Sequence, residues 1–271
     1  MPKKVKLIGV PSFAGAREET SCAIDQHNGP RAVRHALTEL YQGFDIPVPL
    51  EDVGDLPPIN TVPELLDAVE ERVFNLISEG TVPFILGGAH TLTLGTLRAL
   101  KRARRNFSLI YIDAHPDIMP HPHVNYGSSI YYALEEKVVD ERRVAFIGIR
   151  QVERAEWEVI GKKNLFHIPA RDFSRVALES LVQKISSQIP PPYLMSFDLD
   201  ALDPTFAPGV TSPFPCGLSP REVLFVMTEL CHQEVLGIEI VELSPINDPL
   251  KQTARIAAFF VQQLATLVTS R

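Results

Sequence analysis

The chain has 271 residues, of which 45% are hydrophobic, and its 33 acidic and 26 basic side chains give a formal net charge of -7. This composition can bury a large core, argues against a general nucleic-acid-binding surface and favours a small cationic ligand. The first ten residues lack the pattern of a secretion signal, and no apolar run reaches transmembrane length. The three cysteines lack paired spacing. We therefore expect a cytoplasmic protein without a membrane partner.

Strand-like and helix-like segments alternate along the chain. Apolar runs predict strands over 5–10, 82–88, 107–113, 144–149, 193–199 and 235–241. Helical spacing and start signals predict helices from 29, over 63–79, from 93, over 128–136 and 178–189, from 219 and from about 253, and residues 12–28 are expected to form a long polar loop. This order predicts a mainly parallel sheet with helices on both faces, as a single three-layer α/β/α domain over residues 1–271.

One stretch carries three metal-capable side chains at alternate positions. An apolar run from Ser108 ends in Asp113-Ala-His115-Pro-Asp117, and in an extended backbone alternate residues point to the same side. A hydrated turn would look similar, because polar residues commonly follow strands. A second apolar run ends in Asp198 and Asp200, and this repetition favours a metal site.

Two further apolar runs end in residues of the same kind. The run over 82–88 leads through Ala89 to His90, and the run over 235–241 leads to Glu242. In an open parallel sheet, ligands bind outside the carboxyl ends of the strands. We therefore expect all four strand ends to converge on one site.

Gathered carboxylates require cations, because each raises the pKa of its neighbours. Oxygen-rich ligation with one or two imidazoles favours manganese or a similar ion over a structural zinc. The ligands outnumber what one ion can use, so a pair of ions roughly 3.5–4 Å apart is expected, and such a pair can deprotonate a bridging water for hydrolysis.

Three segments together resemble the signatures of the arginase and agmatinase (ureohydrolase) family. They are Gly87-Gly-Ala-His90, Asp113-Ala-His115-Pro-Asp117 and Ser196-Phe-Asp198-Leu-Asp200-Ala-Leu-Asp203-Pro204. Related segments at Gly9, Gly29–Arg34 and Val241–Pro245 extend the resemblance over nearly the whole chain. The resemblance implies an arginase-like fold, two manganese(II) ions, a homo-oligomer (trimer or hexamer) and hydrolysis of a guanidino compound to urea and an amine.

Matching positions also imply roles for single residues. The resemblance assigns His90 and Asp117 to one manganese, His115 and Asp200 to the other, and Asp113 and Asp198 to both. A bridging hydroxide would attack the guanidinium carbon, Asp117 would accept its proton, and Glu242 would pair with the substrate guanidinium.

Two positions depart from the family pattern. Ala89 stands where the family commonly has an aspartate, and loss of such a supporting hydrogen bond typically costs about 10 to 100-fold in metal affinity or activity. Tyr126 stands where a proton-shuttling histidine is common, and a phenol with a pKa near 10 is a poorer shuttle. His123 lies close enough in sequence to act instead, whereas His121 is interpreted as solvated.

The substrate is the least determined feature. The loop over 120–125 lacks the polar run with which arginases hold the amino-acid end of arginine, so agmatine or a related linear guanidine is preferred. Two alternatives stay open: a formimino-compound hydrolase resembling formiminoglutamase, and a metal-binding family member without ureohydrolase activity. A dimetal phosphatase is less favoured, because no arginine or lysine joins the ligand motifs.

Overall fold

Eight strands form one parallel sheet at the centre of the structure, a computed structural model that describes residues 3–16, 21–40, 49–103 and 106–270. The strands are β1 (Lys4–Val10), β2 (Glu51–Asp55), β3 (Thr81–Gly87), β4 (Ser108–Ile112), β5 (Val144–Ile147), β6 (Phe166–Ile168), β7 (Tyr193–Asp198) and β8 (Val235–Val241). Their order across the sheet is β2-β1-β3-β8-β7-β4-β5-β6, and each pairing is parallel. The mainly parallel sheet predicted from the sequence is confirmed.

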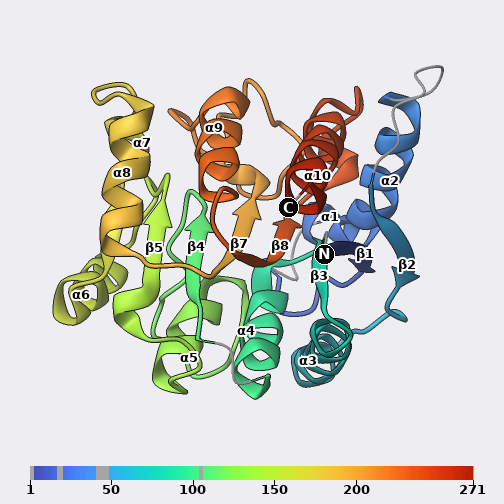
Figure 1. The fold of residues 1–271 in the computed structure, drawn as a ribbon, viewed down its shortest axis with the longest axis horizontal. Helices are drawn as coiled ribbons and strands as arrows, with labels where there is room; N and C mark the ends of the chain where they lie inside the picture. The colour runs from blue at the N-terminus through green and yellow to red at the C-terminus, as the bar shows by residue number, and fades with distance from the viewer. Residues whose placement is uncertain (1–2, 17–20, 41–48, 104–105, 271) are drawn as a thin grey trace.

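Helices cover both faces of the sheet (Figure 1). They are α1 (Ser21–Asp25), α2 (Gly29–Leu40), α3 (Val62–Ser78), α4 (Thr93–Arg102), α5 (Ser129–Glu135), α6 (Arg154–Lys163), α7 (Ala170–Phe173), α8 (Leu178–Gln188), α9 (Pro220–Leu230) and α10 (Gln252–Thr269). In Figure 1, α2, α8, α9 and α10 lie above the sheet, and α3, α4 and α5 lie below it. This arrangement confirms the predicted three-layer fold.

Burial on both faces explains why the central strands read as continuous apolar runs. Every residue of β3, β4, β7 and β8 is buried, as expected where helices cover a parallel sheet on both sides. One face packs residues such as Phe197 against Phe260 of α10, and the other packs residues such as Ile85 against α3 and α4. The sheet therefore separates two hydrophobic cores.

Several elements differ from the sequence-based expectation. The strands β2 and β6 and the helices α6 and α7 were not predicted. The expected loop over 12–28 contains α1 and the short 3-10 helix η1 (Gln26–Asn28). Residues 17–20 of that loop lie outside the described ranges. β2 is an edge strand with the sequence Glu-Asp-Val-Gly-Asp, four of whose five residues are exposed, so it has no apolar run to detect. Among the helices of the described ranges, none has the length and apolar character to cross a membrane.

Candidate metal centre

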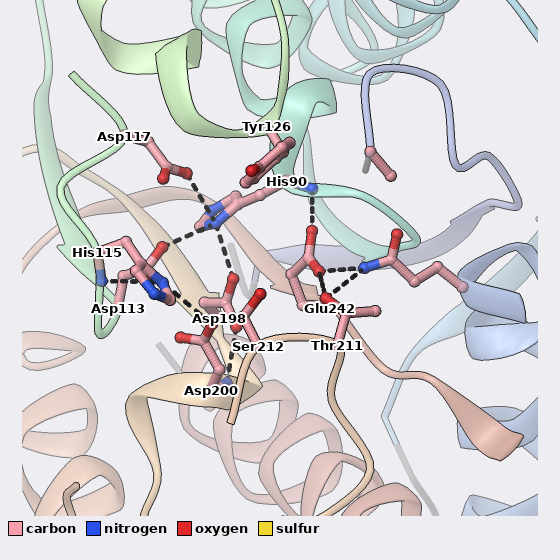
Figure 2. Close-up of a pocket in the computed structure, with 12 residues that line it drawn as sticks. His90, Asp113, His115, Asp117, Tyr126, Asp198, Asp200, Thr211, Ser212 and Glu242 are labelled. Carbon is pink, nitrogen blue, oxygen red and sulfur yellow. Dashed lines mark hydrogen bonds and ion pairs between the residues drawn. The ribbon is translucent and has the colours of Figure 1, made fainter. Parts of the chain in front are cut away.

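The six predicted ligand residues and the predicted substrate-pairing residue Glu242 follow four strands that are neighbours in the sheet, β3, β8, β7 and β4. His90 begins the 3-10 helix η2 (His90–Leu92) after β3, and Glu242 follows β8. Asp198 ends β7, Asp200 lies in the 3-10 helix η5 (Leu199–Ala201), and the remaining three follow β4: Asp113, His115 and Asp117. Because parallel strands end at the same edge, the structure gathers all seven side chains in one place (Figure 2).

These side chains line a cavity of about 90 Å³. Its wall also contains five residues from other segments of the chain: Ala16, Gln26, Tyr126, Thr211 and Ser212. Two sets of side chains in it have ligand atoms that all lie within 4.8 Å of one another. We call the first the His90 group (His90, Asp113, Asp117) and the second the His115 group (Asp113, His115, Asp200). Asp113 belongs to both.

The His90 group is deeply buried. His90 Nδ1 lies 3.0 Å from Asp113 Oδ2 and 3.8 Å from Asp117 Oδ2, and Asp198 Oδ2, outside both groups, lies 3.1 Å away. The phenol of Tyr111 stacks on the imidazole and donates a 2.6 Å hydrogen bond to Asp117 Oδ2. Several carboxylates therefore converge on the same nitrogen of His90.

The His115 group lies nearer to solvent. His115 Nδ1 is 3.3 Å from Asp113 Oδ1 and 3.2 Å from Asp200 Oδ2, and its Nε2 is 2.9 Å from Gln151 Oε1. Asp200 Oδ1 accepts a hydrogen bond from the backbone N–H of Ala114, which orients its carboxylate. Again one ring nitrogen faces carboxylates, while the other is held by a neutral partner, as is usual for a ligating histidine.

Burial and mutual repulsion dominate the electrostatics. Burial raises the pKa of Asp117 and of Asp198 well above the usual range, and the neighbouring aspartate charges add to this. Burial alone would lower the pKa of His90, but Asp113 and Asp198 outweigh it and raise that pKa well above the usual range. The cluster therefore binds protons or other cations more strongly than isolated carboxylates do, as expected of carboxylates that lie close together.

Asp113 shows that the donor set fits a metal ion. Its Oδ2 is buried and, within the described ranges, accepts no well-directed hydrogen bond, although it lies 3.0 Å from His90 Nδ1, and its carboxylate is common to both groups. Burial raises the pKa of Asp113, yet His115 and His90 outweigh this and hold it below the usual range. Hard carboxylate oxygens with one imidazole in each group suit manganese and similar divalent ions.

Two residues of the site have left-handed backbones. Asp117 has a φ of 50° and Glu242 a φ of 70°, values that non-glycine residues rarely adopt. The backbone N–H of Glu242 donates to the carbonyl of Gly88 (2.9 Å), and the carbonyl of Asp117 accepts from the N–H of Ile130 (3.0 Å). These bonds hold both residues in conformations that turn their side chains into the cavity.

Glu242 is held on the far side of His90 from Asp117 (Figure 2). Its Oε1 accepts the backbone N–H of His90 (2.7 Å), and its Oε2 accepts from the Thr211 hydroxyl (3.0 Å) and from the Gln26 side-chain amide. Burial raises the pKa of Glu242 to about 7, although the His90 N–H works in the opposite direction. A fixed carboxylate beside the metal donors can pair with a cationic substrate.

The three residues considered for proton transfer occupy different places. Tyr126 lies in the 3-10 helix η3 (Tyr126–Ser128), lines the inner cavity and also an adjoining outer cavity of about 400 Å³. His121 lines the outer cavity only. His123 is exposed and lines neither cavity, although its backbone N–H donates to His121 Nδ1 (3.2 Å).

Several residues of the site were not singled out from the sequence. Tyr111 and Ser196 lie inside buried strands, where they read as ordinary core positions. Gln26, Thr211 and Gln151 lie in connections of ordinary polar composition. Tyr111 and Ser196 each lie two residues before a predicted ligand aspartate, on the same face of the strand, and only this position could have indicated them.

The fold and the donor set together define an α/β/α protein with a candidate metal site, and known proteins identify its family. A model of the arginase family matches residues 3–266. A guanidinobutyrase from Pseudomonas aeruginosa is 29% identical over 95% of this chain and 84% of its own, and an agmatinase from Blochmanniella floridana is 32% identical over 85% of this chain and 78% of its own. The solved structure of an arginase from Bacillus caldovelox has a TM-score of 0.85 at 25% identity, and the match covers 97% of this chain and 98% of that one.

The chain belongs to the arginase family. It is a ureohydrolase-type hydrolase whose site contains side chains suited to hold metal ions. The family resemblance drawn from the sequence is confirmed.

Proposed function

We propose that this protein hydrolyses a linear guanidino compound, with agmatine preferred over arginine, to urea and an amine with two manganese(II) ions. The observation that carries the proposal is the position of Glu242 in the same cavity as the His90 and His115 groups. A guanidinium paired with this carboxylate lies next to the metal donors.

The proposed ligands would divide around Asp113. His90 and Asp117 would hold one ion, His115 and Asp200 the other, and Asp113 and Asp198 both. Bound divalent ions supply a nucleophilic water at neutral pH and stabilise the charge that develops on the substrate. Asp117, held by the Tyr111 hydroxyl, would accept a proton, and Glu242 would orient the guanidinium. Tyr126 is the proposed route for protons to the outer cavity, since His123 lines neither cavity.

The outer cavity supports the choice of substrate. Among the described residues that line it are Glu153 and Glu156, and none of them is a lysine or arginine. Such a wall favours a substrate whose far end carries an amine and disfavours a carboxylate at that end. Agmatine has an amine there, whereas guanidinobutyrate has a carboxylate.

A product assay tests the proposal. Manganese-loaded protein is incubated with agmatine, arginine, guanidinobutyrate, guanidinopropionate and formiminoglutamate, and urea, formamide and ammonia are measured. We expect urea from agmatine at the highest kcat/KM, and no turnover by the Asp198→Ala variant. Formamide from the formimino substrate would support the alternative hydrolase, and the absence of any product with manganese bound would support a non-enzymatic role.

A further inference from the structure

A polar row crosses the sheet beneath His90. The strand registers place five residues side by side on β3, β8, β7, β4 and β5: Ile85, Glu239, Ser196, Tyr111 and Phe146. All five are buried, and the first and last are apolar members of the core that packs on α3 and α4. The three polar residues in the middle therefore interrupt a hydrophobic layer.

Glu239 is the least expected member of this row. It is 0% exposed, and its Oε2 accepts a 2.7 Å hydrogen bond from the hydroxyl of Thr93 at the start of α4. Its Oε1 has no hydrogen-bond partner in the part of the chain that the structure describes. A buried carboxyl oxygen without a partner destabilises a fold, so a glutamate here calls for a role other than packing.

A line of contacts connects Glu239 to His90. Thr93 Oγ1 lies 3.4 Å from Ser196 Oγ, a long contact, and Ser196 Oγ lies 2.8 Å from His90 Nε2. Each hydroxyl carries one proton. Since Thr93 donates its proton to Glu239, its oxygen can only accept from Ser196. Ser196 in turn can accept the Nε2–H of His90.

This direction determines which nitrogen of His90 is free. With a proton kept on Nε2, the nitrogen left to bind a metal ion is Nδ1, which faces Asp113 and Asp198. Ala89, next to His90 in the chain, is buried and has no polar side-chain atom with which to support the ring. The support for His90 therefore comes from the sheet beneath it.

We propose that Glu239 and Thr93 are positioning residues for the metal centre, which fix the tautomer and orientation of His90 through Ser196. The inference rests on the proposed function only in taking His90 as a metal ligand. Glu239→Gln can reverse the direction of these hydrogen bonds, because an amide N–H can donate to Thr93. Thr93→Val removes the hydroxyl without changing the shape of the side chain.

The experiment compares these variants with Thr96→Val. Thr96 lies on the same helix, is fully buried, and has a hydroxyl without a hydrogen-bond partner among the described residues, so it controls for the loss of a buried hydroxyl. Manganese stoichiometry and affinity are measured, together with the absorption spectrum of the cobalt(II) form. We expect Glu239→Gln and Thr93→Val each to weaken one of the two bound ions by about 10-fold, with an altered cobalt spectrum, and Thr96→Val to match the wild type.

The double variant strengthens the test. If the two residues act through one line, Glu239→Gln combined with Thr93→Val is no worse than the more affected single variant. Wild-type affinity and spectrum in both single variants, or equal losses in Thr96→Val, would overturn the inference and leave the proposed function intact. A wild-type protein that binds two ions without hydrolysing a guanidine would instead overturn the proposed function alone, because the affinities still test Glu239.

Discussion

The His90 group and the His115 group share Asp113 but lie in different surroundings. The His90 side chain is 1% exposed and sits between Tyr111 and Ser196, whereas the His115 side chain is 23% exposed and contacts the exposed Gln151. Electrostatic interactions are stronger and ligands move less in the buried environment. If each group holds an ion as proposed, this difference predicts that the ion at His115 exchanges with solvent more readily than the ion at His90.

The largest effect is expected where the two groups meet. Asp113→Asn keeps the size of the side chain but removes the charge that both groups use, so both ions should bind poorly. Turnover is expected to fall about 1000-fold or more, since metal ions supply several kcal/mol of transition-state stabilisation. Metal analysis and the urea assay measure this, with His35→Asn, at an exposed histidine of α2 that lines neither cavity, as a control. Normal manganese content in Asp113→Asn would contradict the shared role.

Replacing each histidine in turn separates the groups. His90→Asn and His115→Asn should each lose one of two manganese equivalents, with a loss of affinity of at least about 100-fold, beyond that typical of outer supporting residues. In the wild type, dilution into a chelator should remove one equivalent first. The ion that stays bound should be the one at His90, which the His90→Asn variant does not hold. Simultaneous loss of both ions in either variant would argue against two distinguishable sites.

A substitution at Glu242 tests whether this residue binds the substrate beside the His90 group. Glu242→Gln preserves an acceptor for the His90 N–H but removes the charge that faces a guanidinium. The loss of a charge pair worth about 2 kcal/mol predicts a decrease in kcat/KM of about 30-fold. Steady-state kinetics with agmatine measures it, and manganese content serves as the control. An unchanged KM and kcat would remove Glu242 from substrate binding.

The pKa shifts predict how the metal-free protein responds to pH. The pKa values of Asp117, Asp198, Asp200 and Glu242 are raised mainly by burial, and those of His90 and His115 are raised by neighbouring aspartates that outweigh burial. In each case the folded state holds protons that the unfolded state has released, so stability falls as pH rises. The lowered pKa of Asp113 has the opposite effect, because it makes stability rise with pH, but this effect is confined to pH values below about 4.

We therefore expect the Tm of metal-free protein to fall by about 5 °C between about pH 5 and about pH 8. Manganese replaces those protons, so the increase in Tm that it causes should grow over the same range. Thermal unfolding with and without manganese measures both trends. A Tm that rises with pH in the metal-free protein would show that the cluster is not protonated as described.

The smallest expected effect concerns proton transfer through Tyr126. Tyr126→His places a group with a pKa nearer neutrality at the wall of both cavities. We expect kcat to rise about 3-fold at neutral pH, with a shifted pH–rate profile, whereas His123→Asn should change neither. No shift in the profile of Tyr126→His would assign the proton route to another group.

The sequence predicted best where burial is most complete. The central strands appeared as apolar runs because helices cover both faces of the sheet. The candidate metal donors stood out because acidic residues and histidines follow those runs at the strand ends. β2 and β6 lie at the edges of the sheet and are short or polar, so no pattern marked them.

The supporting residues of the site were harder to predict for a different reason. Tyr111, Ser196 and Glu239 read as parts of buried strands, and their roles depend on which residues lie beside them in neighbouring strands. Gln26 reaches Glu242 across 216 positions of sequence. Contacts of this kind come from the register of the sheet and the path of the loops, which composition and periodicity do not encode.

The bond between the backbone N–H of His90 and Glu242 Oε1 joins the residue proposed to hold an ion to the residue proposed to hold the substrate. The backbone of Glu242 also donates to the carbonyl of Gly88, two positions before His90. Any adjustment of this loop that favours one occupant alters the affinity for the other, and thermodynamic linkage makes the two effects equal. A guanidinium compound should therefore change the affinity of the His90 group for its ion, even when it is not turned over.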